Sequence, residues 1–322
     1  MDKDSKRYSY SRLSTFKKCP RQHHYIYEEL IPTKDSKETI PGSYFHKCME
    51  LIKKNPGKDV SKELDCLYKQ YASQVVNGEI DTDEDQLEYT VTNYLAYYRD
   101  KELFERVLLV EGDFMDLLEA TDKDDILVGK IDKVYEDQGL FNIVADYKTT
   151  LGNLKYTKED VETNEQLLLY VPFAQNLLGI EIHAIEIDEV SMRKLQDVPL
   201  LKNGKPTVAK EKLSLVTYDA YYDKLKSMGL DNSPEYKEVL DYLQTRGHPL
   251  FRRTRVQLID KNLIATNAED IIETYKGAKS QLKFKNKGPL CNYCKYKELC
   301  SLDDHKPTDE TRNIIIQKIT TK

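Results

Sequence analysis

The spacing of apolar residues changes near residue 105, and this change constrains the fold more than any other feature of the chain. Upstream of it, residues 60–104 place Tyr and Leu at helical spacing. Downstream, residues 106–120, 124–137 and 140–150 are short runs rich in Val, Ile, Leu and Phe. The segments TDKD and DQG that separate them are typical of tight turns. The sequence therefore predicts three consecutive strands, joined by antiparallel connections, after a helical region.

The residues that follow continue this alternation. Residues 157–179 are expected to form a helix, with Pro172 as a kink inside it, and residues 180–191 alternate as a strand does. The order of helix, three strands, helix and strand predicts an α/β protein with a central sheet flanked by helices.

The flanking regions are predicted to be mostly helical. Residues 9–31 form an aromatic-rich helical pattern that Ser9 or Ser11 would cap, and another helix is expected to begin near Ser43. Residues 255–265, RVQLIDKNLIA, are expected to be a short strand pair, and a last helix is placed near 267–283.

Neither an internal repeat nor a low-complexity linker divides the chain, so residues 1–322 are expected to be one domain. Its core is placed at about 40–195. Residues 1–39 and 265–305 flank this core. Residues 200–265, a polar loop with two helical stretches, are an appended region without an assignable motif.

Composition narrows the class of protein. An apolar fraction of 39% and a charged fraction of 32% are typical of a globular protein with a highly charged surface. The charged N-terminus has no apolar signal core and no stretch approaches the length of a membrane span, so an intracellular, cytoplasmic protein is expected.

The net charge of −6 argues against a uniformly basic nucleic-acid surface, although it leaves room for a local one. Basic residues gather in FRRTR and KGAKSQLKFKNKG, which are either solvated faces or nucleic-acid contacts: Arg252, Arg253, Arg255, Lys276, Lys279, Lys283, Lys285 and Lys287.

The chain has six cysteines, three of them near the N-terminus. The other three lie close together in CNYCKYKELC: Cys291, Cys294 and Cys300. Because no secretion signal is evident, close cysteines suggest a metal before a disulfide. Cys19, beside a proline in FKKCPRQ, is the best candidate for a fourth ligand, whereas Cys48 and Cys66 lie in apolar helical patterns and are assigned to packing. Four thiolates suit zinc or a [4Fe–4S] cluster, and their spacing alone does not decide between the two.

Acidic and basic residues in the second and third predicted strands suggest a catalytic site. If these strands pair as a hairpin, Asp132 and Asp146 converge at one end of the sheet, and Lys148 shares a face with Asp146. Such carboxylates need a hard cation such as Mg²⁺ or Mn²⁺, and the lysine can stabilise charge that develops on a phosphate. Taken alone, an Asp146–Lys148 surface ion pair is the simpler explanation.

Further polar residues favour the catalytic interpretation. His46 can add a nitrogen ligand to the same metal, although a lone histidine on a helix is more often a packing or surface residue. Gln166 and Tyr170 are spaced i, i+4 and therefore share one helix face just after the D-x-K strand. Glu111 in the first strand is a weaker candidate, which either adds a ligand or faces solvent.

In this order, SYSRLSTFKKCPRQHHYIY, GSYFHKCMEL, GKIDKV, VADYKTT, QLLLY and CNYCKYKELC resemble the PD-(D/E)XK nuclease superfamily. The resemblance is to RecB-like exonucleases that carry an iron–sulfur cluster, including CRISPR-associated and phage-encoded members. It implies a restriction-endonuclease-like core: a mixed central sheet flanked by helices, with a helical N-terminal segment and a C-terminal cluster region.

The resemblance also implies roles for single residues. The catalytic Mg²⁺ or Mn²⁺ would be held by His46, Asp132, Asp146 and the backbone carbonyl of Tyr147. Lys148 would position the attacking water, with Gln166 and Tyr170 near the substrate. A structural [4Fe–4S] cluster that joins both ends of the chain would be bound by Cys19, Cys291, Cys294 and Cys300.

The function implied is a metal-dependent DNA exonuclease that acts on single-stranded DNA or on a free end, in a bacterium or a phage-infected host. Protein partners would belong to recombination, repair or CRISPR adaptation. No G-x-x-x-x-G-K-[ST] phosphate loop is present, so no motor is expected. Two alternatives remain: a zinc-stabilised DNA-binding module, and an inactive nuclease fold that serves as an assembly partner.

Overall fold

The structure is a computed structural model that describes residues 6–32, 39–76, 84–100, 102–117, 125–258, 260–280, 282–305 and 307–321. The predicted TDKD turn lies outside these ranges. The central sheet contains β1 (Arg7–Tyr8), β2 (Glu105–Leu117), β3 (Ile126–Asp137), β4 (Phe141–Thr150), β5 (Ala184–Ser191) and β6 (Phe251–Gln257).

The sheet is mixed, as predicted for the fold class. Strands β2, β3 and β4 pair antiparallel in chain order, β4 pairs parallel with β5, and β6 is antiparallel to β5 at the sheet edge. The short β1 runs parallel to β3. The crossover from β4 to β5 carries two helices, as a parallel pair requires.

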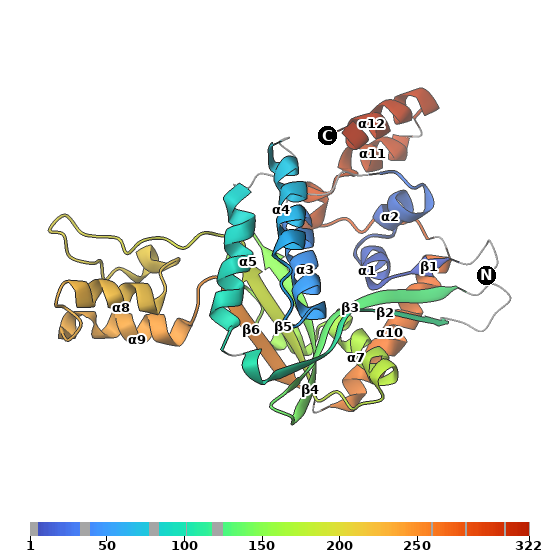
Figure 1. Ribbon diagram of the computed structural model, residues 1–322. Helices are drawn as coiled ribbons and strands as arrows, with labels where there is room; N and C mark the ends of the chain where they lie inside the picture. The colour runs from blue at the N-terminus through green and yellow to red at the C-terminus, as the bar shows by residue number, and fades with distance from the viewer. Residues whose placement is uncertain are drawn as a thin grey trace.

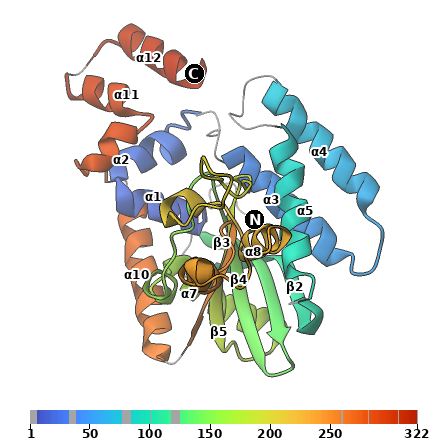
Figure 2. The ribbon, with the colours of Figure 1, turned by 90° about the vertical axis from the view of Figure 1, so that its left-hand side faces the viewer.

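Helices cover both faces of the sheet (Figures 1 and 2). On one face lie α1 (Tyr10–Lys18), α7 (Glu165–Leu178) and α10 (Lys261–Lys279), and on the other lie α3 (Thr39–Lys54), α4 (Ser61–Val76) and α5 (Glu84–Tyr98). The remaining α-helices are α2 (Pro20–His23), α6 (Lys158–Glu162), α8 (Tyr218–Ser227), α9 (Lys237–Arg246), α11 (Lys297–Leu302) and α12 (Asp309–Thr321). Among the described helices, none is both long and apolar enough to cross a membrane.

Strand β4 is buried on both faces, and its residues alternate between two cores. Val144 packs with Ile131, Ile185 and α7, whereas Tyr147 packs with Phe45 of α3 on the opposite face. This alternation follows from the two-residue period of a strand. It also places Asp146 on the same face as Val144, the face that α7 covers.

Local sequence signals fix the helices around β4. The side chain of Ser9 caps α1, one of the two predicted caps, and Asn164 caps α7 by accepting from the amide of Leu167. Gly179 ends α7 in the left-handed conformation, and the helix continues through Pro172. The cap at Asn164 starts α7 next to the end of β4.

Gly42 allows α3 to approach β4 closely. A Cβ atom at this position would lie 2.7 Å from Oγ1 of Thr149. Helix α3 begins at Thr39, earlier than the predicted Ser43, and runs through the glycine towards His46. The helix brings this imidazole over the sheet.

The segment after β6 differs from the prediction. Residues 255–265 are not a strand pair, because β6 ends at Gln257 and α10 begins at Lys261. The side chain of Asp260 accepts a hydrogen bond from the amide of Asn262 and caps the new helix. The helix predicted near 267–283 therefore starts earlier, and it is not the last helix, because α11 and α12 follow it. The two predicted helical stretches between β5 and β6 are α8 and α9, which project from the sheet around their own apolar cluster (Figure 1).

The arginines of FRRTR are paired with carboxylates of the sheet, although the side chain of Arg252 stays partly exposed. They lie on β6, where Arg253 reaches Asp188 at 2.7 Å and Glu105 at 2.5 Å, and Arg255 reaches Glu186 at 3.0 Å. Carboxylates of the same protein therefore neutralise these guanidinium groups. Cys48 is buried in α3 as predicted, but Cys66 is exposed on the polar side of α4, so its assignment to packing was wrong.

Candidate active site

One imidazole and two carboxylates meet above the middle of the sheet. Nδ1 of His46, on α3, lies 3.4 Å from Oδ2 of Asp132, on β3, and 3.9 Å from Oε1 of Glu111, on β2. The ligand atoms of these three residues all lie within 4.8 Å of one another. One nitrogen and several carboxylate oxygens are donors that suit Mg²⁺ or Mn²⁺.

Glu111 belongs to this group, although the sequence ranked it below the other candidates. It lies between the cross-strand pairs Val110–Lys133 and Gly112–Ile131, and therefore level with Asp132. Its φ of 50° is in the left-handed region, which costs a residue with a side chain about 1–3 kcal/mol and is typical of functional sites. The pairing register of β2 with β3, which the sequence alone does not fix, places it opposite Asp132.

Burial makes the charged form of Asp132 unfavourable without a cation. The pKa of Asp132 is raised to about 7, first because the group is buried and second because Asp146 is near. Burial opposes the charged form of His46, but Glu111 and Asp132 raise its pKa overall. A divalent cation would favour the charged form of Asp132 and the neutral form of His46, so the residues present fit a metal.

Asp146 and Lys148 project from β4 beside this group. Nζ of Lys148 lies 2.6 Å from Oδ2 of Asp146, which is buried and receives no well-directed hydrogen bond. Asp146 itself is outside the His46–Glu111–Asp132 group. The structure therefore brings two of the three predicted side-chain ligands together directly and holds the third against the lysine.

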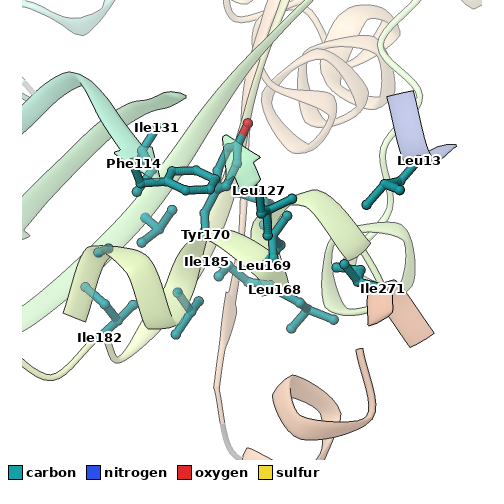
Figure 3. Close-up of a cluster of buried hydrophobic side chains, with 14 of the residues drawn as sticks. Leu13, Phe114, Leu127, Ile131, Leu168, Leu169, Tyr170, Ile182, Ile185 and Ile271 are labelled. Carbon is teal, nitrogen blue, oxygen red and sulfur yellow. The ribbon is translucent and has the colours of Figure 1, made fainter. Parts of the chain in front are cut away.

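A chain of polar contacts fixes Lys148 on its other side. Its ammonium donates to Oε1 of Gln166 at 2.9 Å, and Nε2 of Gln166 donates to the hydroxyl of Tyr170 at 2.7 Å. The ring of Tyr170 packs near Phe114 while its oxygen points away from the aliphatic side chains (Figure 3). The i, i+4 spacing of the glutamine and the tyrosine thus orients the lysine.

Tyr147 connects the two parts of the site through its backbone. Its amide donates a 2.9 Å hydrogen bond to Oδ2 of Asp132, while its ring is buried on the α3 face. This bond fixes the carboxylate relative to β4. The D-x-K segment of β4 therefore carries Asp146 and orients Asp132 on the adjacent strand β3.

The four predicted cluster cysteines line a single cavity of about 300 Å³ between the chain ends: Cys19, Cys291, Cys294 and Cys300. They come from the α1–α2 junction, from the turn Pro289–Tyr293 with the residue after it, and from α11. Within the described part of the chain, no three cysteine sulfurs lie within 4.8 Å of one another. The four cysteines therefore line the same cavity, although no three of their sulfur atoms converge on one point.

A mixed sheet of this topology, with acidic residues and a lysine at its centre, defines a nuclease of the restriction-endonuclease-like class. The sequence matches the PD-(D/E)XK nuclease superfamily over residues 7–301, and the chain belongs to this superfamily. No curated protein matches it. Membership supports a metal-dependent nuclease with DNA as its substrate.

Proposed function

We propose that the protein is a metal-dependent exonuclease that hydrolyses single-stranded DNA. The observation that carries the proposal is the chain of contacts from Asp146 through Lys148 to Gln166, directly beside the His46–Glu111–Asp132 group. This arrangement offers a cation site and a fixed ammonium group to one phosphodiester.

The proposed ligands of Mg²⁺ or Mn²⁺ are His46, Glu111, Asp132, Asp146 and the carbonyl of Tyr147. When bound, the cation supplies positive charge to the phosphate and lowers the pKa of water. The residues themselves provide the orientation, since Asp132 is fixed by the amide of Tyr147 and lies opposite Glu111.

Lys148 positions the water and stabilises the charge that develops on the phosphate. Burial alone would favour its neutral form, but Asp146 raises the pKa of the lysine above its usual value. It therefore stays protonated at neutral pH and acts as a cation rather than as a base. Gln166 and Tyr170 restrict its ammonium to one direction.

The proposal includes a structural [4Fe–4S] cluster in the cysteine cavity. Four thiols line this one cavity, and four thiolates are the ligand number that such a cluster takes. The choice of an iron–sulfur cluster over zinc rests on the family resemblance. The cluster would be held by Cys19, Cys291, Cys294 and Cys300 and would join the two ends of the chain.

In this proposal residues 1–322 form one nuclease domain with its core at about 40–195, and α8 and α9 belong to an appended region. A place in intracellular recombination, repair or CRISPR adaptation follows from the resemblance alone.

The test is cleavage of linear single-stranded, linear double-stranded and circular single-stranded DNA, in Mg²⁺, Mn²⁺ or chelator. We expect a ladder of short products from the linear single strand only, with metal and not with chelator. Cutting of the circle would overturn the exonuclease assignment, and absence of cleavage with every metal would overturn the nuclease assignment. Iron and zinc content of protein purified without oxygen tests the cluster, for which about four iron atoms per chain are expected.

A further inference from the structure

A second cavity adjoins the catalytic lysine. It measures about 240 Å³ and is formed by the end of β4, the loop after it and the end of β5. The residues that line it include Lys148, Leu151, Lys155 and Tyr156, together with the deeply buried Glu189 and Met192. We refer to these six residues as the end pocket.

The end pocket has a fixed shape. The loop that covers it is attached to β5 at two points, because the amide of Lys155 donates to Oε1 of Glu189 at 2.7 Å and the hydroxyl of Ser191 donates to the carbonyl of Gly152 at 2.8 Å. The amide of Met192 also donates to the carbonyl of Thr150 at 2.8 Å. A ligand would therefore enter a preformed site.

The charge of the end pocket is positive. Its one carboxylate, Glu189, is already neutralised by Arg252, with Nη2 at 2.7 Å and Nε at 3.1 Å. Lys155 is exposed, and its ammonium has no carboxylate within ion-pair distance among the residues that the structure describes; it lies 5.4 Å from the ring of Tyr156. Lys155 thus offers this space an ammonium group, which is the chemistry that recognises a phosphate, beside Lys148, whose own ammonium is held by Asp146 at 2.6 Å.

The size and depth of the end pocket suit the end of a strand. Glu189 and Met192 are each only 1% exposed, so the pocket is closed below. Its volume is below the roughly 300–1,000 Å³ of sites for drug-sized ligands, which leaves space for about one nucleotide unit. Tyr156, Leu151 and Met192 supply apolar surface for a sugar or a base. A DNA strand that continued past the pocket in both directions would need an open groove.

We propose that the end pocket binds the phosphorylated terminal nucleotide of the DNA strand, so that the first internucleotide phosphate lies at Lys148. This inference rests on the proposed nuclease function and deepens it. Lys155 holds the terminal phosphate, and the closed floor sets the distance from the strand end to the bond that is cut.

The kinetic test compares single strands that carry a phosphate or a hydroxyl at the degraded end, with the wild type, Lys155→Ala and Lys158→Ala. Lys158 is an equally exposed lysine three residues along the chain, outside the pocket. We expect the phosphate to raise kcat/KM about tenfold for the wild type and Lys158→Ala, and the ratio to fall to about one for Lys155→Ala. An equal kcat/KM of the wild type for phosphate and hydroxyl substrates would overturn the proposal and leave the nuclease function standing. A preference for the phosphate that survives Lys155→Ala would do the same.

A binding test separates the two proposals. Fluorescence anisotropy in chelator measures the affinity of the wild type and Lys155→Ala for labelled trinucleotides with and without a terminal phosphate. If no DNA is ever cut but the phosphate still tightens binding about tenfold through Lys155, the end pocket stands and the nuclease function fails. If the phosphate has no effect on binding, the end pocket is wrong whatever the enzyme cuts.

Discussion

Asp132 shows how a single residue sets the chemistry of the site. It is buried, it accepts from the amide of Tyr147, and its pKa is raised to about 7 by burial and by Asp146. Glu111 and His46 lie close enough to share a cation with it. The strained backbone of Glu111 is maintained because this carboxylate must face the group.

Replacing Glu111 tests whether it is a ligand. We expect Glu111→Gln to weaken Mn²⁺ binding by about 10–100-fold, since an amide removes a negative charge from the group. Isothermal titration calorimetry on folded protein measures the affinity. Asp113→Asn is the matched control, because Asp113 is an exposed carboxylate two residues along the same strand. Equal affinity for the Glu111 variant and the control would remove Glu111 from the site.

At the scale of elements, the contact between α3 and β4 sets the distance from His46 to the carboxylates. Gly42 makes this contact possible, because a Cβ atom there would meet Thr149. Alanine stabilises a helix relative to glycine by about 1 kcal/mol, so the clash and the helix propensity act in opposite directions.

A double-mutant cycle on Gly42 and Thr149 separates these effects. Gly42→Ala alone should gain little or lose stability, whereas Gly42→Ala in a Thr149→Ala background should gain about 1 kcal/mol. The expected coupling is about 1–2 kcal/mol, from urea unfolding of the four proteins. Additive effects would show that α3 does not depend on this close approach.

The N-terminal element α2 predicts a pH dependence of stability. His23 is buried beside Arg12, which donates to it at 3.4 Å, and burial followed by Arg12 lowers the pKa of His23 to about 4. Between pH 6.5 and 4 the unfolded chain therefore binds more protons than the folded one, and the free energy of unfolding falls as the pH is lowered. The contribution is up to about 3 kcal/mol.

His23→Gln should flatten this dependence. Unfolding free energies measured between pH 4 and pH 7 are expected to converge for variant and wild type at the acidic end. A slope identical to that of the wild type would mean that the pKa of His23 is the same in the folded and the unfolded chain.

At the scale of the whole molecule, the two ends of the chain form one unit. The hydroxyl of Tyr25 donates to Asp303 at 2.8 Å, the hydroxyl of Tyr296 donates to the carbonyl of Ile31 at 3.0 Å, and the cysteine cavity lies beside these contacts. Figure 1 shows α2 close to α11 and α12. A group bound in the cavity would stabilise this junction.

Removing one cysteine tests that connection. Cys300→Ser is expected to lose most of the iron and to lower Tm by about 5 °C or more, which is about 3 kcal/mol for a chain of this size. Cys66→Ser, at an exposed cysteine outside the cavity, should change neither quantity. Wild-type protein without iron, or a Cys300 variant that keeps it, would contradict the cluster assignment.

Much of this architecture could be predicted from the sequence because its signals are local. The strand that carries Asp146 and Lys148 is an apolar run between turn residues, and the i, i+4 spacing of Gln166 and Tyr170 fixes their shared face. What could not be predicted depends on distant partners. The arginines of β6 are ion-paired because carboxylates of β2 and β5 meet them, and Glu111 joins the site only through its register with β3.

Lys148 is expected to act at the metal site when DNA is cut, and a comparison of the wild type with Lys148→Ala isolates its role. Single-turnover cleavage of end-labelled single-stranded DNA in Mg²⁺ is measured for the wild type and Lys148→Ala, with Mn²⁺ affinity determined for both. We predict that the substitution slows cleavage at least about 100-fold while metal affinity is not reduced. Cleavage by Lys148→Ala at the wild-type rate, or a wild type that binds metal and DNA but cuts no bond, would contradict the account.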